Sequence, residues 1–407
     1  MIVLAIVFLL IAVRQWFRFP LRIWQIMLGG AVAVLLFFQI TPGNALAAIN
    51  PDVMVFLFCM FVIGEALCRS GYLDTLTNAF FRYAHTSREL VFFVLFGFGA
   101  FSALLMNDTV AIIGTPLVLG IASRSRIPAK LMLLSLAFAI TTGSVASPIG
   151  NPQNLLIAVN SGMHTPFVTF AVWLLLPTLA SLCAAWIVLS LYFRKDWKTA
   201  FSYEPPSEIP HDPALVRIVQ CSLVILIGLT IANISISFIA AAIVIPLPLI
   251  GLAAALPVLV FSSQRFDVVK SIDWTTLIFF AAMFVLMAAV WETGFFQSLA
   301  GIAGVSSVPA ILATSVIISQ FISNVPFVAL FQPLILQAGG GTARLMALAA
   351  GSTIAGNLTI LGAASNVIII QQAEARGETI TFTEFAKVGV PLTLIQIAMY
   401  AIFVTLI

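Results

Sequence analysis

The chain has 407 residues, of which 61% are hydrophobic and only 8% are charged, and its net charge is +3. Soluble proteins carry about 25% charged residues, so this composition excludes a soluble enzyme, and so small a basic excess does not indicate a nucleic-acid partner. The apolar runs are continuous, without the ten-residue alternation of a membrane barrel. The sequence therefore predicts an all-α membrane protein surrounded by the lipid bilayer.

Apolar runs along the chain predict about 10–11 transmembrane segments. Helices are expected near 2–13, 22–40, 52–70, 129–160 (interrupted), 166–193, 214–233, 237–261, 273–292, 343–375 (interrupted) and 384–406. Two further runs, 89–122 and 307–338, are too long for one crossing of about 20 residues. Each has polar residues at its middle, so each is either one broken helix or a pair of short helices forming a re-entrant hairpin.

The positions of Lys and Arg favour the hairpins. If both runs leave the membrane on the side they entered, 17 of the 18 basic residues lie on one face, and Arg344 alone lies on the other. If 89–122 crosses once, this bias disappears. Since basic loops face the cytoplasm, we expect two hairpins and an N-terminus outside.

Three sequence blocks recur in the same order in the two halves of the chain. "MFVIGEALCRSGYL" (60–73) resembles "MFVLMAAVWETGFF" (283–296), Asn107 and Pro116 match Asn324 and Pro333, and "TGSVASPIGNPQN" (142–154) resembles "AGNLTILGAASN" (355–366). By the charge argument the two copies have opposite orientations, as in many secondary transporters. We expect an N-terminal helix and basic loop over 1–21, a first repeat over 22–193, a cytoplasmic linker over 194–213 and a second repeat over 214–407.

Four polar interruptions are expected to meet near the middle of the membrane. Two are hairpin tips and two are helix breaks, where Gly and Pro free backbone groups that only a polar cavity tolerates. Amide and hydroxyl side chains there can coordinate a cation or donate to a polar solute, and helix N-termini add partial positive charge. The candidate substrate- or ion-binding residues are Asn107, Asp108, Thr109, Asn151, Asn154, Ser323, Asn324, Asn357, Thr359, Ser365 and Asn366.

Asp108 is the only carboxylate expected at the middle of the membrane, and Val325 occupies the matching position of the second repeat. A buried aspartate costs roughly 2.5–3.5 kcal/mol on insertion scales. In a low-dielectric surrounding a carboxyl retains its proton more readily, which suits a proton carrier; beside a cation it would stay ionised and act as a ligand. We expect Asp108 to carry the coupling ion, H⁺ or Na⁺. A purely structural role as a helix cap is the alternative.

The tips "NDT" and "SNVP" and the breaks "GNPQN" and "GNLTILGAASN" resemble those of the ion transporter superfamily, and most of all its arsenite permease and NhaD-type antiporter branch. The resemblance covers about residues 20 to 407. It implies a scaffold and a mobile transport unit that moves like an elevator, often in a homodimer, in the cytoplasmic (inner) membrane of a bacterium or archaeon. The second tip has Val325 where the sodium-coupled dicarboxylate carriers have Thr, which weighs against that activity.

Three transport functions remain open on this reading. The first is proton-coupled movement of a small inorganic oxyacid or metalloid such as arsenite, which is neutral near pH 7 and needs no fixed Arg. The second is sodium/proton antiport, with Na⁺ held by Asn107, Asp108 and Asn154; the third is import of a carboxylate or inorganic anion. No resident metal or cofactor is expected, and neither a channel nor an intramembrane enzyme has support, because there is no continuous polar pore and no catalytic pair.

Overall fold

The computed structural model describes residues 3–4, 6–7, 9–10, 22–72, 75, 83–125, 127–195, 197, 212–239, 245–294 and 307–407. Regular structure in these residues is helical, and seven of the helices are long and apolar enough to cross a membrane. Part of the predicted 2–13 helix and most of the 194–213 linker lie outside the described residues. The protein is thus a multi-pass α-helical membrane protein.

Most helices begin and end close to the predicted limits. They are α2 (Ile23–Leu36), α4 (Pro51–Ser70), α6 (Ser87–Leu104), α7 (Asn107–Ser125), α8 (Ala129–Gly143), α9 (Pro152–Asn160), α10 (Pro166–Phe170), α11 (Leu176–Tyr192), α15 (Trp274–Trp291), α17 (Val308–Ile322), α18 (Asn324–Gln337), α19 (Thr342–Leu358), α20 (Ala364–Glu374) and α21 (Phe382–Leu406). The runs 89–122 and 307–338 are each interrupted at the expected polar residues, between α6 and α7 and between α17 and α18. Neither run is a single uninterrupted helix.

Other helix limits differ from the prediction. Helix α12 (Pro213–Ile239) continues six residues beyond the predicted end at 233, and α13 (Leu247–Phe261) begins ten residues after the predicted start at 237. Helix α13 follows Pro246, which occupies its N-cap position, while the apolar run before it contains no residue that would end α12. Two short helices, α3 (Pro42–Ala48) and α14 (Arg265–Ser271), were not expected at all, because each is shorter than a membrane crossing.

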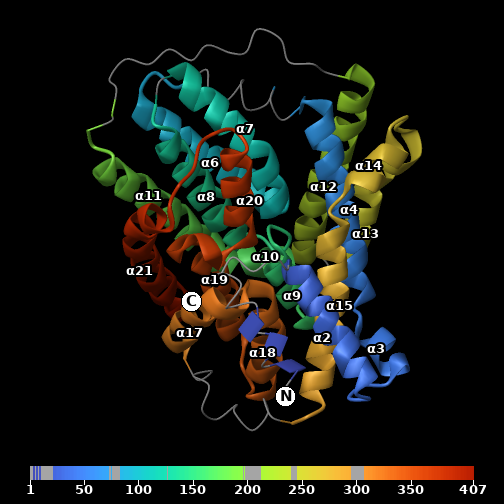
Figure 1. Ribbon diagram of the computed structural model, residues 1–407. Helices are drawn as coiled ribbons and strands as arrows, with labels where there is room; N and C mark the ends of the chain where they lie inside the picture. The colour runs from blue at the N-terminus through green and yellow to red at the C-terminus, as the bar shows by residue number, and fades with distance from the viewer. Residues whose placement is uncertain are drawn as a thin grey trace.

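The helices form two groups that lie side by side (Figure 1). The α4 group consists of α2, α3, α4, α12, α13, α14 and α15, which pack mainly on one another. The α8 group consists of α6, α7, α8, α9, α11, α17, α18, α19, α20 and α21. Contacts between the groups are fewer and include those of α4 with α7 and α9, and of α15 with α18.

Contacts inside the α8 group are reciprocal between the two halves of the chain. Helix α6 packs along α8 as α17 packs along α19, and α11 packs on α21. The short helix after each break crosses to the other half: α9 contacts α18, and α20 contacts α7. Each half of the chain therefore contributes a short helix that packs on the other half.

The first break is held by close backbone packing. A Cβ on Gly143 would lie 2.2 Å from the carbonyl oxygen of Gly99 in α6, and one on Gly150 would lie 2.8 Å from that of Ser102. Between these glycines the chain forms η1 (Ser144–Ala146) and then turns into α9. Glycine is required because α6 and the break touch through their backbones.

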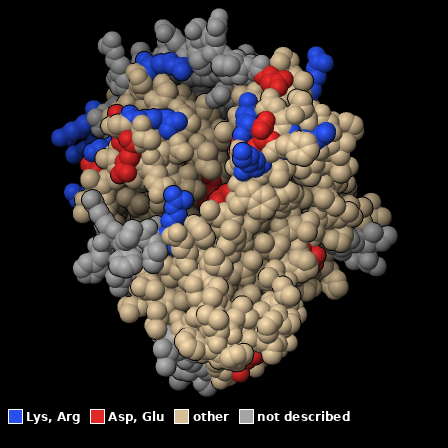
Figure 2. Space-filling model, turned by 45° about the vertical axis from the view of Figure 1, so that its right-hand side comes forward, with Lys and Arg blue, Asp and Glu red and all other residues tan. Residues whose placement is uncertain are grey.

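Basic side chains gather at one end of the molecule, and the rest of the visible face is mostly uncharged (Figure 2). This distribution is the one on which the predicted orientation depends.

Candidate functional site

The first hairpin tip is anchored to the first helix break. The backbone N–H of Asn107 donates to the carbonyl of Gly150 at 2.9 Å, and the backbone N–H of Asp108 donates to Oδ1 of Asn107 at 2.9 Å. Asn107 and Thr109 are buried, while Asp108 is half-buried. The tip thereby presents the Asp108 carboxylate at the N-terminal turn of α7.

The first break is an internally bonded network. Oδ1 of Asn151 caps α9 by accepting the backbone N–H of Asn154 at 2.8 Å, and Nδ2 of Asn154 donates to the carbonyl of Ser147 at 3.0 Å. Thr353 of α19 joins the halves: its hydroxyl donates to Oδ1 of Asn154 at 3.3 Å and accepts from Asn151 at 3.2 Å. The amide of Gln153 reaches the same hydroxyl at 3.4 Å.

The second break is bonded to α8, α17 and α21. Nδ2 of Asn357 donates to Thr142 at 3.0 Å and to Gln396 at 2.9 Å. The hydroxyl of Thr359 donates to Gln320 at 2.8 Å, and Nδ2 of Asn366 donates to the carbonyl of Gly356 at 2.5 Å. Oδ1 of Asn357, Oδ1 of Asn366 and Oγ of Ser365 are buried without a hydrogen-bond partner among the described residues.

The second hairpin tip has an unusual backbone. Ser323 has φ 70° and ψ 155°, in a region that only glycine occupies readily. Asn324 follows as the first residue of α18 and is buried, and its Oδ1 has no partner among the described residues. A strained residue next to an unpartnered polar atom is typical of a functional site rather than of a packing contact.

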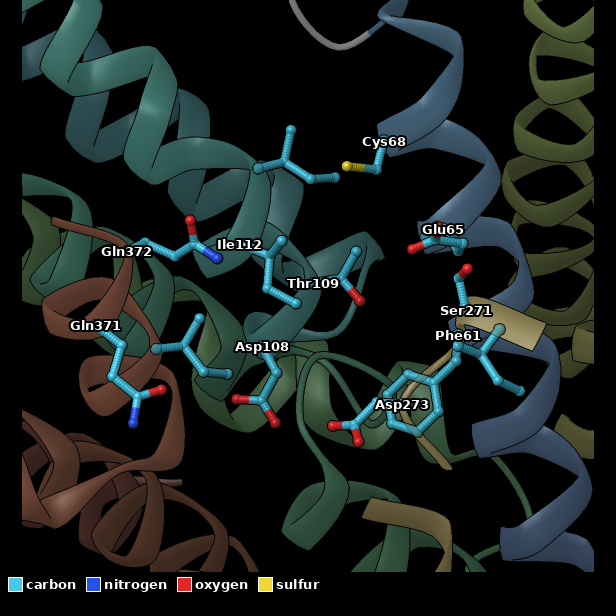
Figure 3. A pocket seen from close by; sticks show the side chains of 14 residues that line it. Phe61, Glu65, Cys68, Asp108, Thr109, Ile112, Ser271, Asp273, Gln371 and Gln372 are labelled. Carbon is cyan, nitrogen blue, oxygen red and sulfur yellow. The ribbon is translucent and has the colours of Figure 1, made fainter. Parts of the chain in front are cut away.

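A cavity of about 410 Å³ lies between the two helix groups. Helix α4 and the segment that joins α14 to α15 form one wall, and α7 and α20 form the other (Figure 3). Asp108 and Thr109 come from the first tip, and Gln371 and Gln372 come from α20. The candidate proton carrier therefore lines an open cavity rather than the interior of one helix group.

The charged side chains that line this cavity are all acidic: Glu65, Asp108 and Asp273. The carboxylates of Asp108 and Asp273 point toward one another across the space (Figure 3). Asp273 is held at the start of α15, where it accepts the Thr276 hydroxyl at 2.6 Å and the Thr275 hydroxyl at 2.5 Å. The described part of the chain contains no group of three acidic, His or Cys side chains placed to hold a metal ion.

Among the described residues, Glu65 is the one carboxylate of the cavity that has an ion-pair partner. Arg69, one helical turn later, lies 2.7 Å from it and also donates to Ser271 of α14 at 2.7 Å. The spacing of four residues places the two side chains on the same face of α4. The guanidinium is thus engaged at the rim of the cavity and does not neutralise Asp108 or Asp273.

Comparison with known proteins decides the family. A family model described as "CitMHS: Citrate transporter" matches residues 6–344. The chain belongs to this citrate transporter family. A 46 kDa membrane protein of Mycobacterium leprae (strain TN) is 28% identical over 88% of this chain and 86% of its own. A protein of Oryza sativa subsp. japonica named as a silicon efflux transporter is 27% identical over 91% of this chain and 89% of its own.

The fold is similar to that of a solved transporter. The crystal structure of the YdaH transporter of Alcanivorax borkumensis superposes with a TM-score of 0.56 and 15% identity, covering 89% of this chain and 87% of that one. At that identity the likeness concerns the fold alone. Family membership and the names of the relatives indicate a transporter rather than an enzyme.

For this member of the CitMHS family, the predicted site residues are divided among three places. Asp108 and Thr109 line the cavity; Asn151 and Asn154 belong to the bonded network of the first break. The remaining candidates lie at or beside the second tip and break: Ser323, Asn324, Asn357, Thr359, Ser365 and Asn366. Asn107 joins the first tip to the first break.

Sequence reasoning missed five polar residues of the cavity: Glu65 as a lining residue, Ser271, Asp273, Gln371 and Gln372. They lie near helix ends, where polar residues usually face water, and nothing in their spacing sets them apart. Asp273 follows the short helix α14, and only the packing of α14 on α4 brings it opposite Asp108.

Proposed function

We propose that this protein is a secondary active transporter that exchanges protons for a small uncharged inorganic oxyacid across the cytoplasmic membrane. The observation that carries the proposal is the cavity, where Asp108 lies at the end of a broken helix and every lining charge is acidic. Carboxylates in one cavity repel a free anion, so the solute is neutral or cationic. Silicic acid and arsenous acid are both neutral near pH 7, and one relative is named for silicon efflux.

Asp108 has the role of proton carrier in this proposal. The residue faces the cavity, and no basic side chain lines the cavity among the described residues. No ion pair there holds the carboxylate ionised, so it is free to gain and lose a proton. Loading and unloading of Asp108 at the two sides of the membrane couples solute movement to the proton gradient. Its counterpart Val325 cannot do this, so one half of the molecule carries the coupling chemistry.

We propose further that transport is an elevator-like movement of the α8 group against the α4 group. Three observations support it: the helices pack within two groups, the cavity lies between them, and the halves of the α8 group exchange contacts reciprocally. In this proposal α6–α7 and α17–α18 are re-entrant hairpins of an inverted repeat. The basic loops face the cytoplasm, and the N-terminus lies outside.

Sodium/proton antiport is a second candidate, favoured by the same acidic cavity. Asp108, Asp273 and the lining hydroxyls of Thr109 and Ser271 are oxygen ligands of the kind that Na⁺ accepts. Carboxylate import, which the family's description suggests, is disfavoured because no Lys or Arg lines the cavity among the described residues, and Arg69, which contacts two lining residues, pairs with Glu65.

Purified protein in proteoliposomes separates these activities. With an imposed pH gradient, uptake or release of arsenite, silicic acid, Na⁺ and citrate is measured together with internal pH. The proposal expects saturable oxyacid movement opposite to proton movement. Saturable Na⁺ exchange without oxyacid flux supports the second candidate instead, and citrate flux alone contradicts both.

A further inference from the structure

The two halves place matching polar side chains at their tips and breaks, but their hydrogen bonding differs. The matched pairs, at the spacings of the internal repeat, are Ser102 and Ser319, Asn107 and Asn324, Gln153 and Ser365, and Asn154 and Asn366. Every first-half member uses its side chain in a hydrogen bond. In every second-half member a buried side-chain oxygen has no partner among the described residues.

A few substitutions between the halves account for the difference. Thr353 supplies the hydroxyl that donates to Oδ1 of Asn154, but the matching position on α8 is Ile140, which has no donor for Asn366. Asn151 caps the first turn of α9, whereas Ala363 precedes α20 and provides no side-chain cap. The first break is thus closed by the protein's own groups, and the second is not.

The side chains with unpartnered oxygens belong to the second tip and the second break of the described chain. Asn366 reaches back to Gly356 at 2.5 Å, so its side chain lies against the second break. Gln320 joins the second tip to the same break, because its Nε2 donates to the carbonyl of Ala355 at 2.9 Å. Ser319 and Asn324 belong to that tip, and Ser365 belongs to the first turn of α20.

Their chemistry selects a class of ligand. Asn324 and Asn366 offer amide oxygens, which only accept hydrogen bonds, while Ser319 and Ser365 offer hydroxyls that do both. The uncapped first turn of α20 adds backbone N–H donors and partial positive charge. A neutral molecule with several hydroxyl groups satisfies both kinds of group at once, because each of its O–H groups donates to one and accepts from another.

We propose that the solute binds only at the second tip and second break, to Ser365, Asn366, Asn324 and the first turn of α20. The first break, whose matching side chains are bonded within the protein, then has a structural role only. This inference rests on the proposed function and specifies where the neutral oxyacid binds. The path from the cavity to this site is short, because Ile368 lines the cavity and lies one helical turn after Ser365 on α20. A cation is disfavoured here, since the end of a helix dipole that points at the ligands is positive.

The two halves supply a matched pair of test variants. Ile140→Thr gives Asn366 the donor that Thr353 gives Asn154, and Thr353→Val removes that donor from the first break. Binding of arsenite and of silicic acid to the detergent-purified protein is measured by calorimetry, without any gradient. We expect about tenfold weaker binding in Ile140→Thr, the scale of one hydrogen bond lost to a ligand, and unchanged binding in Thr353→Val. Ser365→Ala provides a second variant and should also weaken binding about tenfold.

The outcomes separate this inference from the proposed function. Oxyacid binding with these losses, but no proton-coupled flux in proteoliposomes, leaves the binding site standing and ends the coupling proposal. Coupled flux with unchanged affinity in both Ile140→Thr and Ser365→Ala overturns the one-sided site. Weakening by Thr353→Val equal to that by Ile140→Thr also overturns it, because the first break would then contribute to binding. Loss of Na⁺ binding in place of oxyacid binding assigns the oxygens to a cation.

Discussion

The two helix breaks are built alike and bonded differently. Each has a glycine at or within two residues of the end of a long helix, passes through a short 3₁₀ turn and begins a helix that packs on the other half. In the first, Asn151, Gln153 and Asn154 converge on Thr353. In the second, a side-chain oxygen of Ser365 and one of Asn366 have no partner in the described part of the chain. The similar backbones fit the proposed movement between two related states, and in the proposed site the second half binds the solute while the first half has a structural role.

The largest expected effect on transport comes from replacing Asp108, which matches Val325 in the second tip. Asp108→Asn should reduce proton-coupled flux to the background of empty liposomes, because the amide cannot change charge. The variant should still fold, because the hydrogen bond of Asp108 within the tip uses its backbone N–H and not its carboxylate. Asp267→Asn, an exposed carboxylate on α14, is the control and should retain full flux. Normal proton-driven flux in Asp108→Asn would falsify the coupling role.

Glycine-to-alanine exchanges compare the backbones of the two breaks. A Cβ on Gly143 meets the backbone of Gly99 at 2.2 Å, whereas one on Gly356 meets the methyl group of Ala363 at 2.7 Å. Backbone cannot move aside, so we expect Gly143→Ala to lower stability by about 3 kcal/mol or more and Gly356→Ala by less. Thermal unfolding in detergent measures both. Gly29→Ala, where no atom lies within 4 Å, should be neutral.

Removing one polar side chain from each break tests whether the hydrogen bonding of the two breaks differs as the structure indicates. Asn151→Ala strips the cap from α9 and leaves Thr353 and Ser144 with fewer partners, so it should cost about 1–3 kcal/mol of stability. Ser365→Ala removes a hydroxyl without a partner among the described residues and should leave the unfolding temperature unchanged. Equal unfolding temperatures for the two variants would contradict the difference in hydrogen bonding between the first and second breaks.

The contact between the two helix groups provides a kinetic test. A Cβ on Gly64 of α4 would lie 2.5 Å from Cγ2 of Thr109 in the first tip. We expect Gly64→Ala to slow transport several-fold by obstructing movement of α7 along α4, with unfolding temperature little changed. Adding Thr109→Ser removes the obstructing methyl group and should restore part of the rate. Absence of rescue, with a slow single variant, would show that Gly64 acts in some other way.

The smallest effect is expected at the end of the α8 group that the proposal places toward the cytoplasm. Lys130 of α8 and Glu384 of α21 form an ion pair of 2.5 Å with both side chains partly exposed. Such a pair contributes about 0–1 kcal/mol and is screened by salt. Lys130→Ala should therefore lower the unfolding temperature slightly at low salt and not at all at high salt. A large loss of flux would mean that this pair takes part in the movement.

Much of the fold follows from local pattern. Length and hydropathy predicted most helices to within a few residues, and the polar residues at Asn107 and Ser323 marked where two long runs are interrupted. The error at α12 and α13 has a local cause as well, because the run from 233 to 245 holds no Gly, Pro or charge to mark an end. Short helices such as α14 carry no such signal and were missed.

The candidate site was predictable in part for a different reason. A carboxylate inside an apolar run is costly, so Asp108 stands out in the sequence alone, and the structure places it on a cavity wall. Asp273 belongs to an ordinary polar loop, and only the packing of distant segments turns it toward Asp108. Likewise, no spacing rule could have distinguished Asn154, whose Oδ1 accepts from Thr353, from Asn366, whose Oδ1 has no partner among the described residues, because both are Asn in the same motif.

The sequence by itself determined that the protein is a helical membrane protein, where its helices break and which carboxylate is exceptional, since hydrophobicity and the cost of buried polarity act locally along the chain. Tertiary structure alone decided which polar groups are satisfied and which face an open space. Hydrogen bonds between α8, α19 and the breaks join residues some 200 positions apart, and whether a donor such as Thr353 arrives beside its acceptor depends on how the two halves pack.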